Sequence, residues 1–252
     1  MYKALFFDIS GVLYDGEQEI PGAVEAIARA QDSDLEVRFV TNTSRKTCTQ
    51  IYRDLIRFGF SLELEQIFTA SVAAKALLKQ HHWRPYCLLH DNIRSEFAEL
   101  DQSDPNAVFI SDAEAGFNYH ALDKAFQLCH AGAPLIGIGL NRYFKSEGKL
   151  HLDAGPFIRA IEYAAATEAI IVGKPSADFF AQVVRSVAAP ADKMLMVGDD
   201  VFGDVEGALK AGLQACLVKT GKYQPNDEQL VKAPFLCVDS VVEAVDCALR
   251  VA

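Results

Sequence analysis

An apolar run near the N-terminus, LFFDISGVLY (residues 5–14), ends in a carboxylate and a tight turn. A short continuous apolar run bounded by glycine is typical of a buried strand in a parallel sheet. Open α/β sheets carry their chemistry in the crevice at the carboxyl ends of such strands. A carboxylate there is costly unless a partner uses it. The run therefore predicts an α/β fold with Asp8 in a functional crevice.

Apolar runs of strand length alternate with amphipathic segments along the rest of the chain. The predicted strands cover residues 37–40, 67–69, 86–89, 107–110, 134–138, 169–172, 194–197 and 215–218. The predicted helices cover residues 22–30, 71–80, 93–100, 119–130 and 156–166, with others before Gly59, after Ser176, after Asp200 and after Ser240. This alternation predicts βαβ units and a parallel sheet.

Composition narrows the class of protein. The 252 residues are 50% hydrophobic and 23% charged, with a net charge of -10, which disfavours a nucleic-acid partner. The six cysteines form no C-x-x-C pair, so we expect reduced thiols. No apolar run approaches the roughly 20 residues that cross a bilayer, and Asp8 interrupts the first one, unlike a signal peptide. We expect a cytoplasmic protein with no membrane partner.

Four polar clusters follow apolar runs and together describe a phosphate-handling site. Asp8, Thr41-Asn42, Lys174 and Asp199-Asp200 each stand at a predicted strand end. Two carboxylates provide oxygen ligands for Mg²⁺, which tends to share its coordination with substrate phosphate. A hydroxyl and turn amides can hold phosphate oxygens, and an aspartate can attack phosphorus to form an aspartyl-phosphate. A small phosphorylated substrate is therefore the expected partner.

Each cluster alone has a simpler interpretation. A lone aspartate after an apolar run is commonly a helix N-cap, and Gly-Lys-Pro or Gly-Asp-Asp alone is a turn. A phospholigand-binding or regulatory module without turnover is an alternative function for the combined site. A response-regulator receiver also phosphorylates an aspartate at a strand end, but such a domain is shorter than this chain. A dinucleotide-binding motif at Gly137-Ile138-Gly139 is weakly indicated, because Arg142 stands in place of its third glycine.

The same residues resemble the motifs of the haloacid dehalogenase superfamily, whose members are mostly Mg²⁺-dependent phosphohydrolases. The motif Asp-x-Asp-Gly-[Thr/Val]-Leu matches residues 8–13 except at Ser10. The second motif matches Thr41 and Asn42, the third Lys174, and the fourth Gly198-Asp199-Asp200 with Asp204. The resemblance covers nearly the whole chain. It implies a Rossmann-like parallel-sheet core, residues 1–71 and 154–252, with an inserted α/β cap of subclass IIA, residues 72–153.

Three further stretches resemble a narrower group within this subclass. Residues 37–42, 90–97 and 220–223 are similar to the phospholysine phosphohistidine inorganic pyrophosphate phosphatases and to the haloacid dehalogenase-like hydrolase domain-containing proteins. Both groups share the opening Asp-[Ile/Leu]-Ser-Gly, and the residues do not separate them. Homodimerisation through the cap is a further implication.

The resemblance also implies roles for single residues. Asp8 is expected to be the nucleophile and a metal ligand, Asp199 a second ligand, and the Ser10 backbone carbonyl a third. The phosphoryl group is expected to contact Asp8, Ile9, Ser10, Thr41, Asn42 and Lys174, with Lys174 also pairing with Asp8. Asp204 is expected to orient the ligands, whereas Asp200 has no assigned role.

Ser10 changes the expected chemistry, because the usual aspartate at this position protonates the leaving group. A serine hydroxyl is a very poor acid near neutral pH, and general acid–base assistance typically contributes about 10²–10⁴-fold. Its loss should affect alkyl phosphates most. The sequence therefore predicts a preference for P–N and P–O–P bonds, as in phosphohistidine, phospholysine and pyrophosphate.

Overall fold

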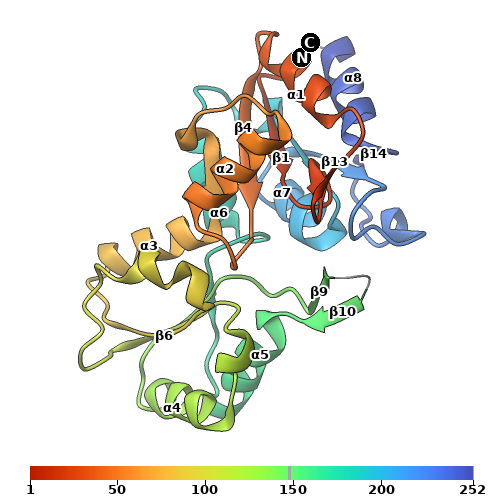
Figure 1. The fold of residues 1–252 in the computed structure, drawn as a ribbon. Coiled ribbons are helices and arrows are strands. Elements are labelled where there is room, and N and C mark those ends of the chain that lie inside the picture. The colour runs from red at the N-terminus through yellow and green to blue at the C-terminus, as the bar shows by residue number, and fades with distance from the viewer. Residues whose placement is uncertain (147–148, 252) are drawn as a thin grey trace. The chain divides into compact units, whose positions relative to one another are not determined.

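A computed structural model of the protein describes residues 1–146 and 149–251, and it divides into two compact units (Figure 1). The first unit comprises Met1–Thr41, Cys48–Phe68 and Lys174–Ala252. The second comprises Asn42–Thr47 and Thr69–Gly173. Each unit has its own sheet and its own cluster of buried apolar side chains.

The first unit contains a six-stranded sheet in the order β14-β13-β12-β1-β4-β5. Its strands are β1 (Ala4–Asp8), β4 (Glu36–Thr41), β5 (Ile67–Thr69), β12 (Met194–Gly198), β13 (Gln214–Val218) and β14 (Leu236–Val238). A short antiparallel ribbon, β2 (Tyr14–Asp15) and β3 (Gln18–Glu19), follows the first turn. The predicted α/β class is therefore confirmed.

Strand β1 lies inside this sheet, where all five of its residues are buried. It runs parallel to β12 on one side and to β4 on the other, with Phe7 opposite Val197 and Asp8 opposite Val40. Within the sheet, β1 therefore has the next long strand of the chain, β4, as one neighbour and the much later strand β12 as its other neighbour. Asp8 and Thr41 end β1 and β4, and Asp199 directly follows β12, so all three stand at the strand ends where open α/β sheets carry their chemistry.

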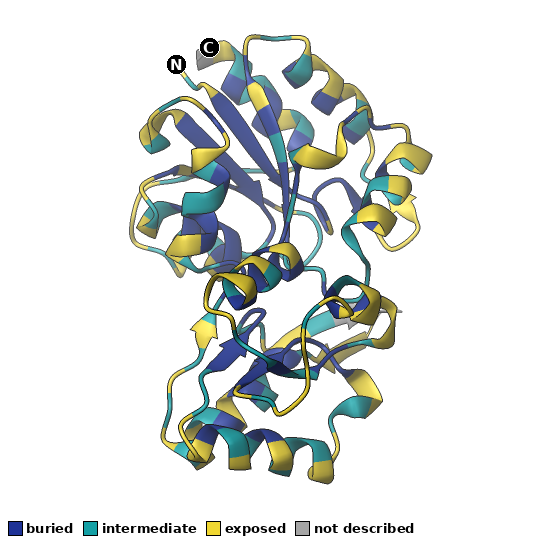
Figure 2. Cartoon of the chain, turned by 90° about the vertical axis from the view of Figure 1, so that its left-hand side faces the viewer, coloured by how far each residue is buried: buried dark blue, intermediate teal, exposed yellow. Residues whose placement is uncertain are grey.

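The helices of the first unit are amphipathic and cover the sheet. They are α1 (Ala23–Gln31), α2 (Cys48–Phe58), α6 (Ala177–Arg185), α7 (Gly207–Lys210) and α8 (Val241–Val251), with 3-10 turns Leu64–Gln66, Ala191–Lys193 and Asp227–Gln229. In α1 the buried residues Ala23, Ala26, Ile27 and Ala30 repeat with helical spacing, and they join the apolar cluster that contains β1. Figure 2 shows the buried strands and the exposed outer faces of the helices.

The second unit is built on a four-stranded parallel sheet in the order β11-β8-β7-β6. Its strands are β6 (Pro85–Leu88), β7 (Ala107–Ile110), β8 (Leu135–Gly137) and β11 (Ile170–Ile171). Its helices are α3 (Ala70–Gln80), α4 (Tyr119–His130) and α5 (Ala154–Ala165), with 3-10 segments η2 (Asp91–Phe97) and η3 (Glu114–Gly116). An antiparallel hairpin joins β9 (Tyr143–Ser146) to β10 (Lys149–Leu152).

The structure differs from the sequence-based expectation at four places. The segment 154–173, expected in the core, belongs to the second unit, because Ile158 and Ile161 join its apolar cluster and β11 pairs with β8. The predicted helix at 93–100 is instead the 3-10 segment η2, whose first turn is capped by the His90 side chain. Strand β14 and the β9–β10 hairpin were not predicted. Among the described residues, no helix has both the length and the apolar character needed to span a bilayer.

Candidate active site

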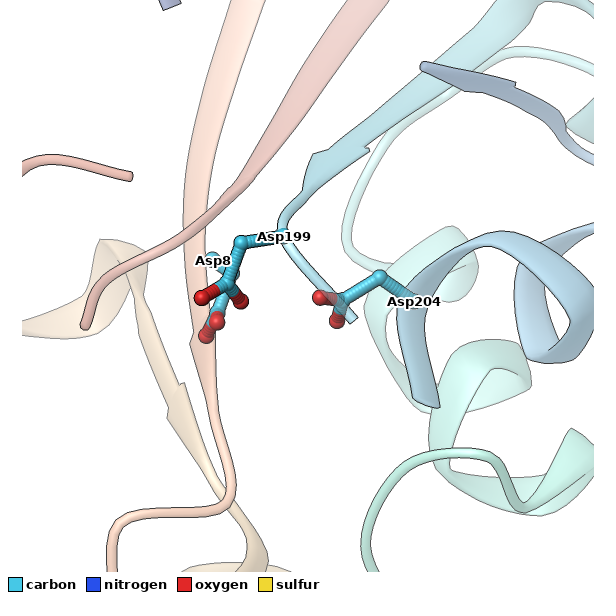
Figure 3. A group of neighbouring side chains, drawn as sticks. All are labelled: Asp8, Asp199 and Asp204. Atoms are coloured by element: carbon cyan, nitrogen blue, oxygen red, sulfur yellow. The ribbon is translucent and has the colours of Figure 1, made fainter. Parts of the chain in front are cut away.

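Three buried carboxylates of the first unit gather at the strand ends. Asp8 ends β1, Asp199 follows β12, and Asp204 lies in the π-helical segment η5 (Val201–Glu206). One oxygen of each lies within 4.8 Å of the others, and the three residues are 5%, 1% and 0% exposed. Figure 3 shows the carboxylates of Asp8 and Asp199 together, with that of Asp204 pointing toward them. Like charges this close in a buried place require cations.

Lys174 supplies one of these cations. Its Nζ lies 2.8 Å from Oδ1 of Asp8 and 2.6 Å from Oδ1 of Asp204. Burial alone would lower the pKa of Lys174, but the carboxylates of Asp204 and Asp8 outweigh burial and raise it. The lysine is therefore a fixed positive charge beside Asp8. Lys174 follows a strand, as the sequence predicts, but that strand, β11, pairs with β8 in the sheet of the second unit.

Asp199 has one satisfied and one unsatisfied oxygen. Its Oδ2 accepts a hydrogen bond of 2.7 Å from the backbone N–H of Lys222. Its Oδ1 is buried and has no hydrogen-bond partner among the described residues. Burial, together with repulsion from Asp8, raises the pKa of Asp199 well above its ordinary value. An orphaned, buried carboxylate oxygen of this kind is suited to a ligand that brings positive charge.

Two glycines allow the backbone to approach Asp199 closely. Gly11 and Gly221 have φ values of 85° and 58°, and their Cα atoms lie near each other. A Cβ on either residue would overlap the Asp199 carboxylate. The Thr220 hydroxyl also donates a 2.5 Å hydrogen bond to the carbonyl of Gly11. The turn after β1 and the loop after β13 are thus joined around Asp199.

Asp200 organises the segment that carries Asp204. Its Oδ1 accepts hydrogen bonds from the N–H groups of Phe202 and Gly203, at 3.1 and 2.8 Å. The N–H of Asp200 in turn donates to Oδ2 of Asp204 at 3.1 Å, so both Asp204 oxygens have partners. Burial raises the pKa of Asp204 to about 6, although Lys174 acts in the opposite direction. Asp204 therefore holds the Lys174 side chain and the backbone at Asp200, and neither of its oxygens is left for a metal ion.

The remaining residues of the predicted site lie on the two strand-end turns. Thr41 is buried at the end of β4, and Asn42 follows it as the first residue of a segment counted with the second unit. The amide oxygen of Asn42 lies against Gly173, where a Cβ would overlap it, and Gly173 precedes Lys174. Ile9 is buried in the core, whereas Ser10 is exposed.

Lys222 is a residue that the sequence analysis did not place in the site. Its Nζ lies 3.6 Å from Oδ2 of Asp200, and its backbone N–H holds Asp199. Burial would lower its pKa, but the charges of Asp199, Asp200, Asp8 and Asp204 raise it. The sequence does contain a pattern that could have indicated Lys222, because the polar stretch Thr220-Gly221-Lys222 follows the apolar strand β13 as the other site residues follow theirs.

The charges of the site test whether a divalent cation fits. When ionised, four carboxylates (Asp8, Asp199, Asp200 and Asp204) face two ammonium groups (Lys174 and Lys222), which leaves two negative charges in excess. One divalent cation would cancel this excess. The unpartnered Asp199 Oδ1 and the neighbouring Asp8 are oxygen donors of the kind that Mg²⁺ prefers, so the residues fit that ion.

Comparisons with known proteins point to one family of hydrolases. Residues 5–103 match a family of haloacid dehalogenase-like hydrolases, and residues 171–244 match a family described as HAD-hydrolase-like. The human phospholysine phosphohistidine inorganic pyrophosphate phosphatase is 43% identical over 98% of this chain and 94% of its own length. The bovine haloacid dehalogenase-like hydrolase domain-containing protein 2 is 41% identical over 98% of this chain and 96% of its own.

Solved structures show the same fold. The 4-nitrophenylphosphatase from Thermotoga maritima has a TM-score of 0.88 at 22% identity, covering 97% of both chains. The glycerol phosphate phosphatase from Mycobacterium tuberculosis, solved in complex with magnesium, has a TM-score of 0.81 at 22% identity. It covers 95% of this chain and 76% of its own. The resemblance inferred from residues 8–13, 41–42, 174 and 198–204 is thus confirmed at the level of the family.

Proposed function

The chain belongs to the haloacid dehalogenase-like hydrolases, and from this premise we propose a Mg²⁺-dependent phosphatase that prefers pyrophosphate and phosphoramidates. The observation that carries the proposal is the placement of Asp8. Its carboxylate lies 2.8 Å from Lys174 and beside Asp199, at the end of the strand between β12 and β4. A nucleophile fixed by a cation, beside an orphaned metal-ligand oxygen, suits phosphoryl transfer.

We assign Asp8, Asp199 and the backbone carbonyl of Ser10 as the protein ligands of Mg²⁺. Asp204 is left out of this set because both of its oxygens already accept hydrogen bonds. Bound there, the ion would polarise the phosphoryl oxygens and offset their negative charge. The chain's own part is to hold these oxygens in place and keep water from the buried carboxylates.

The proposed reaction has two steps. An oxygen of Asp8 attacks phosphorus, and the bond to the leaving atom breaks with its electron pair going to that atom. Water then attacks phosphorus and gives up a proton to solvent, the bond to the Asp8 oxygen breaks with its electron pair going to that oxygen, and inorganic phosphate is released with the Asp8 carboxylate restored. Thr41, Asn42 and the backbone amides of Ile9 and Ser10 would hold the transferred phosphoryl oxygens, while Lys174 keeps Asp8 ionised and oriented.

Ser10 supports the proposed substrate preference. Its side chain cannot protonate an alkoxide, so the leaving group has to be stable as it departs or to take its proton from solvent. The phosphate released from pyrophosphate and the amine released from a phosphoramidate both meet this requirement. The names of the relatives point the same way, since the 43% identical human protein is named for phospholysine, phosphohistidine and pyrophosphate.

A substrate panel tests the proposal. Initial rates are measured with and without Mg²⁺ on pyrophosphate, imidodiphosphate, phosphohistidine, phospholysine, 4-nitrophenyl phosphate and a hexose phosphate. We expect turnover of the P–O–P and P–N compounds to exceed that of the hexose phosphate. The variant Ser10→Asp should raise hexose phosphate turnover by about 10²-fold or more if it restores an acid. Robust hexose phosphate hydrolysis by the wild type, with inert pyrophosphate and imidodiphosphate, would reject the preference.

We further propose that the second unit, most of which (Thr69–Gly173) is inserted in the chain of the first, is the cap of this phosphatase. The same unit would carry a homodimer contact. Leu150 and Leu152 on its hairpin are each 65% exposed, which supports a partner surface there. Light scattering on the purified protein, with Leu150→Glu/Leu152→Glu as the comparison, measures this. A monomeric wild type would exclude the homodimer.

A further inference from the structure

The two lysines of the site differ in what they can reach. The Lys174 side chain is 5% exposed and contacts Asp8 and Asp204 at 2.8 and 2.6 Å. The Lys222 side chain is 33% exposed, and its described ion pair with Asp200 is longer, at 3.6 Å. Lys174 is therefore enclosed by carboxylates, whereas the ammonium group of Lys222 can meet a further anion from solution.

The backbone of Lys222 is fixed beside the site. Its N–H donates to Asp199 Oδ2 at 2.7 Å, and its carbonyl accepts a 3.3 Å hydrogen bond from the Gln224 side chain. The preceding Gly221 is packed against Gly11 and Asp199. Because Gly11 directly follows Ser10, the Lys222 side chain starts close to the turn where the family's acid is replaced by serine.

The charges around Lys222 are those of the site. Its Nζ lies 3.6 Å from Oδ2 of Asp200, its backbone N–H holds Asp199, and the carboxylates of Asp8 and Asp204 lie beside that of Asp199. These carboxylates outnumber the two lysines by two charges, and a divalent cation on Asp8 and Asp199 would cancel that excess. With that excess cancelled, the partly exposed Lys222 ammonium group no longer faces a surplus of carboxylates and can pair with an anion of the substrate.

We propose that Lys222 is a leaving-group subsite that binds the departing phosphate of pyrophosphate and thereby favours anionic over amine leaving groups. This inference rests on the proposed function and names a specificity-determining residue for it. An ammonium beside the leaving atom stabilises the negative charge that develops there, which partly replaces the proton that Ser10 cannot supply. The same charge gives no such help to a neutral or protonated amine, as in phosphohistidine and phospholysine.

The experiment compares Lys222→Met and Lys222→Arg with the wild type, at saturating Mg²⁺. Rates are measured on pyrophosphate and on phosphohistidine, and kcat and KM are reported separately. For Lys222→Met we expect kcat/KM on pyrophosphate to fall about tenfold or more, as for loss of a charged hydrogen bond, and Lys222→Arg to recover most of it. The phosphohistidine value should change by a smaller factor. Lys219→Met is the matched control, because Lys219 pairs with Asp239 on the surface at 3.0 Å.

A binding measurement separates failure of this inference from failure of the proposed function. Calorimetry follows imidodiphosphate and Mg²⁺ binding to Asp8→Asn and to Asp8→Asn/Lys222→Met, so no turnover is needed. Affinity about tenfold weaker in the double variant would support the subsite even if the wild type proved inactive. Equal affinities, or equal losses on pyrophosphate and phosphohistidine, would overturn it, as would imidodiphosphate failing to bind either variant. A wild type that hydrolyses only hexose phosphates would instead reject the proposed function.

Discussion

The two sheets of this protein both carry polar residues at the carboxyl ends of parallel strands, yet they differ in charge balance. In the first unit, the carboxylates of Asp8, Asp199 and Asp204 meet beside Lys174. In the second unit, Asp112 is the one carboxylate that is buried among the described residues, and it stands two residues beyond β7. Sheet geometry alone therefore does not distinguish a site of chemistry from a structural contact.

The carboxylate of the second unit is fully partnered. Oδ2 of Asp112 accepts a 2.5 Å hydrogen bond from Nε of Arg45, and Oδ1 accepts one from the N–H of Glu114 at 3.0 Å. The Arg45 guanidinium also lies 4.5 Å from the centre of the Phe144 ring. In the first unit, by contrast, Asp199 Oδ1 has no partner among the described residues and negative charge is in excess. Only the first arrangement calls for a ligand.

The largest expected effect comes from replacing the nucleophile in the unbalanced site. Asp8→Asn removes the attacking oxygen, and we expect kcat on pyrophosphate to fall by at least ~10³-fold, since loss of a nucleophile commonly removes most of the rate acceleration. Steady-state assays with Mg²⁺ measure it. Phosphate binding by calorimetry is the control and should persist. Equal, negligible turnover in wild type and variant would favour the alternative of a phospholigand-binding module.

Asp199→Asn tests the excess charge directly. Without Mg²⁺ the variant should be more stable than the wild type, because one of the crowded carboxylates is neutralised. Mg²⁺ should stabilise the wild type by ~2.7 kcal/mol at 100 times its Kd and the variant far less. Urea denaturation at several Mg²⁺ concentrations measures both effects. The same Mg²⁺ dependence in wild type and variant would contradict the assigned ligand set.

The strand-end rule found much of this site from sequence. Asp8 and Asp199 follow continuous apolar runs, and the structure places them at the ends of adjacent strands, with Lys174 paired to Asp8. The helical spacing of apolar residues in α8 likewise predicts a buried face, formed by Val241, Val242, Ala244, Val245 and Leu249. The first, third and fourth of these are buried in the core, and Val242 and Leu249 are partly buried against it. These predictions succeed because a buried strand or helix face needs apolar side chains at regular spacing, and that spacing can be read from the sequence.

What the sequence did not reveal depends on pairing between distant segments. Strand β11 has two residues, and nothing local shows that it pairs with β8 rather than joining the strand of Asp199. Leu150 and Leu152 of the hairpin alternate with polar residues, but both are exposed, so this short alternation does not mark a buried strand face. Lys222 was overlooked because a lysine after a strand is common, and its importance lies in contacts with residues more than twenty positions away.

The partnered carboxylate of the second unit should behave in the opposite way to Asp199. Arg45→Met leaves buried Asp112 without its cation and should cost roughly 1–3 kcal/mol of stability, with no dependence on Mg²⁺. Arg45→Met/Asp112→Asn removes both charges and should be less destabilised than the sum of the single variants. Urea denaturation of all four proteins measures the coupling. Two outcomes would contradict the comparison: stability losses that simply add in the double variant, or a stability loss that depends on Mg²⁺. Either would show that the Asp112 carboxylate is not balanced by Arg45.

The smallest expected effect sets the baseline for these comparisons. Arg29 and Asp246 form a 2.7 Å ion pair between α1 and α8, but their side chains are 45% and 43% exposed. Solvent and salt screen such a pair, so Arg29→Met should change stability by about 0.5 kcal/mol or less, and less still at high salt. The Arg45–Asp112 pair has similar chemistry but one buried partner. If Arg29→Met lost as much stability as Arg45→Met, burial of the carboxylate would not determine the cost of removing its arginine. The contrast between the strand end of Asp112 and that of Asp199 would then lose its physical basis.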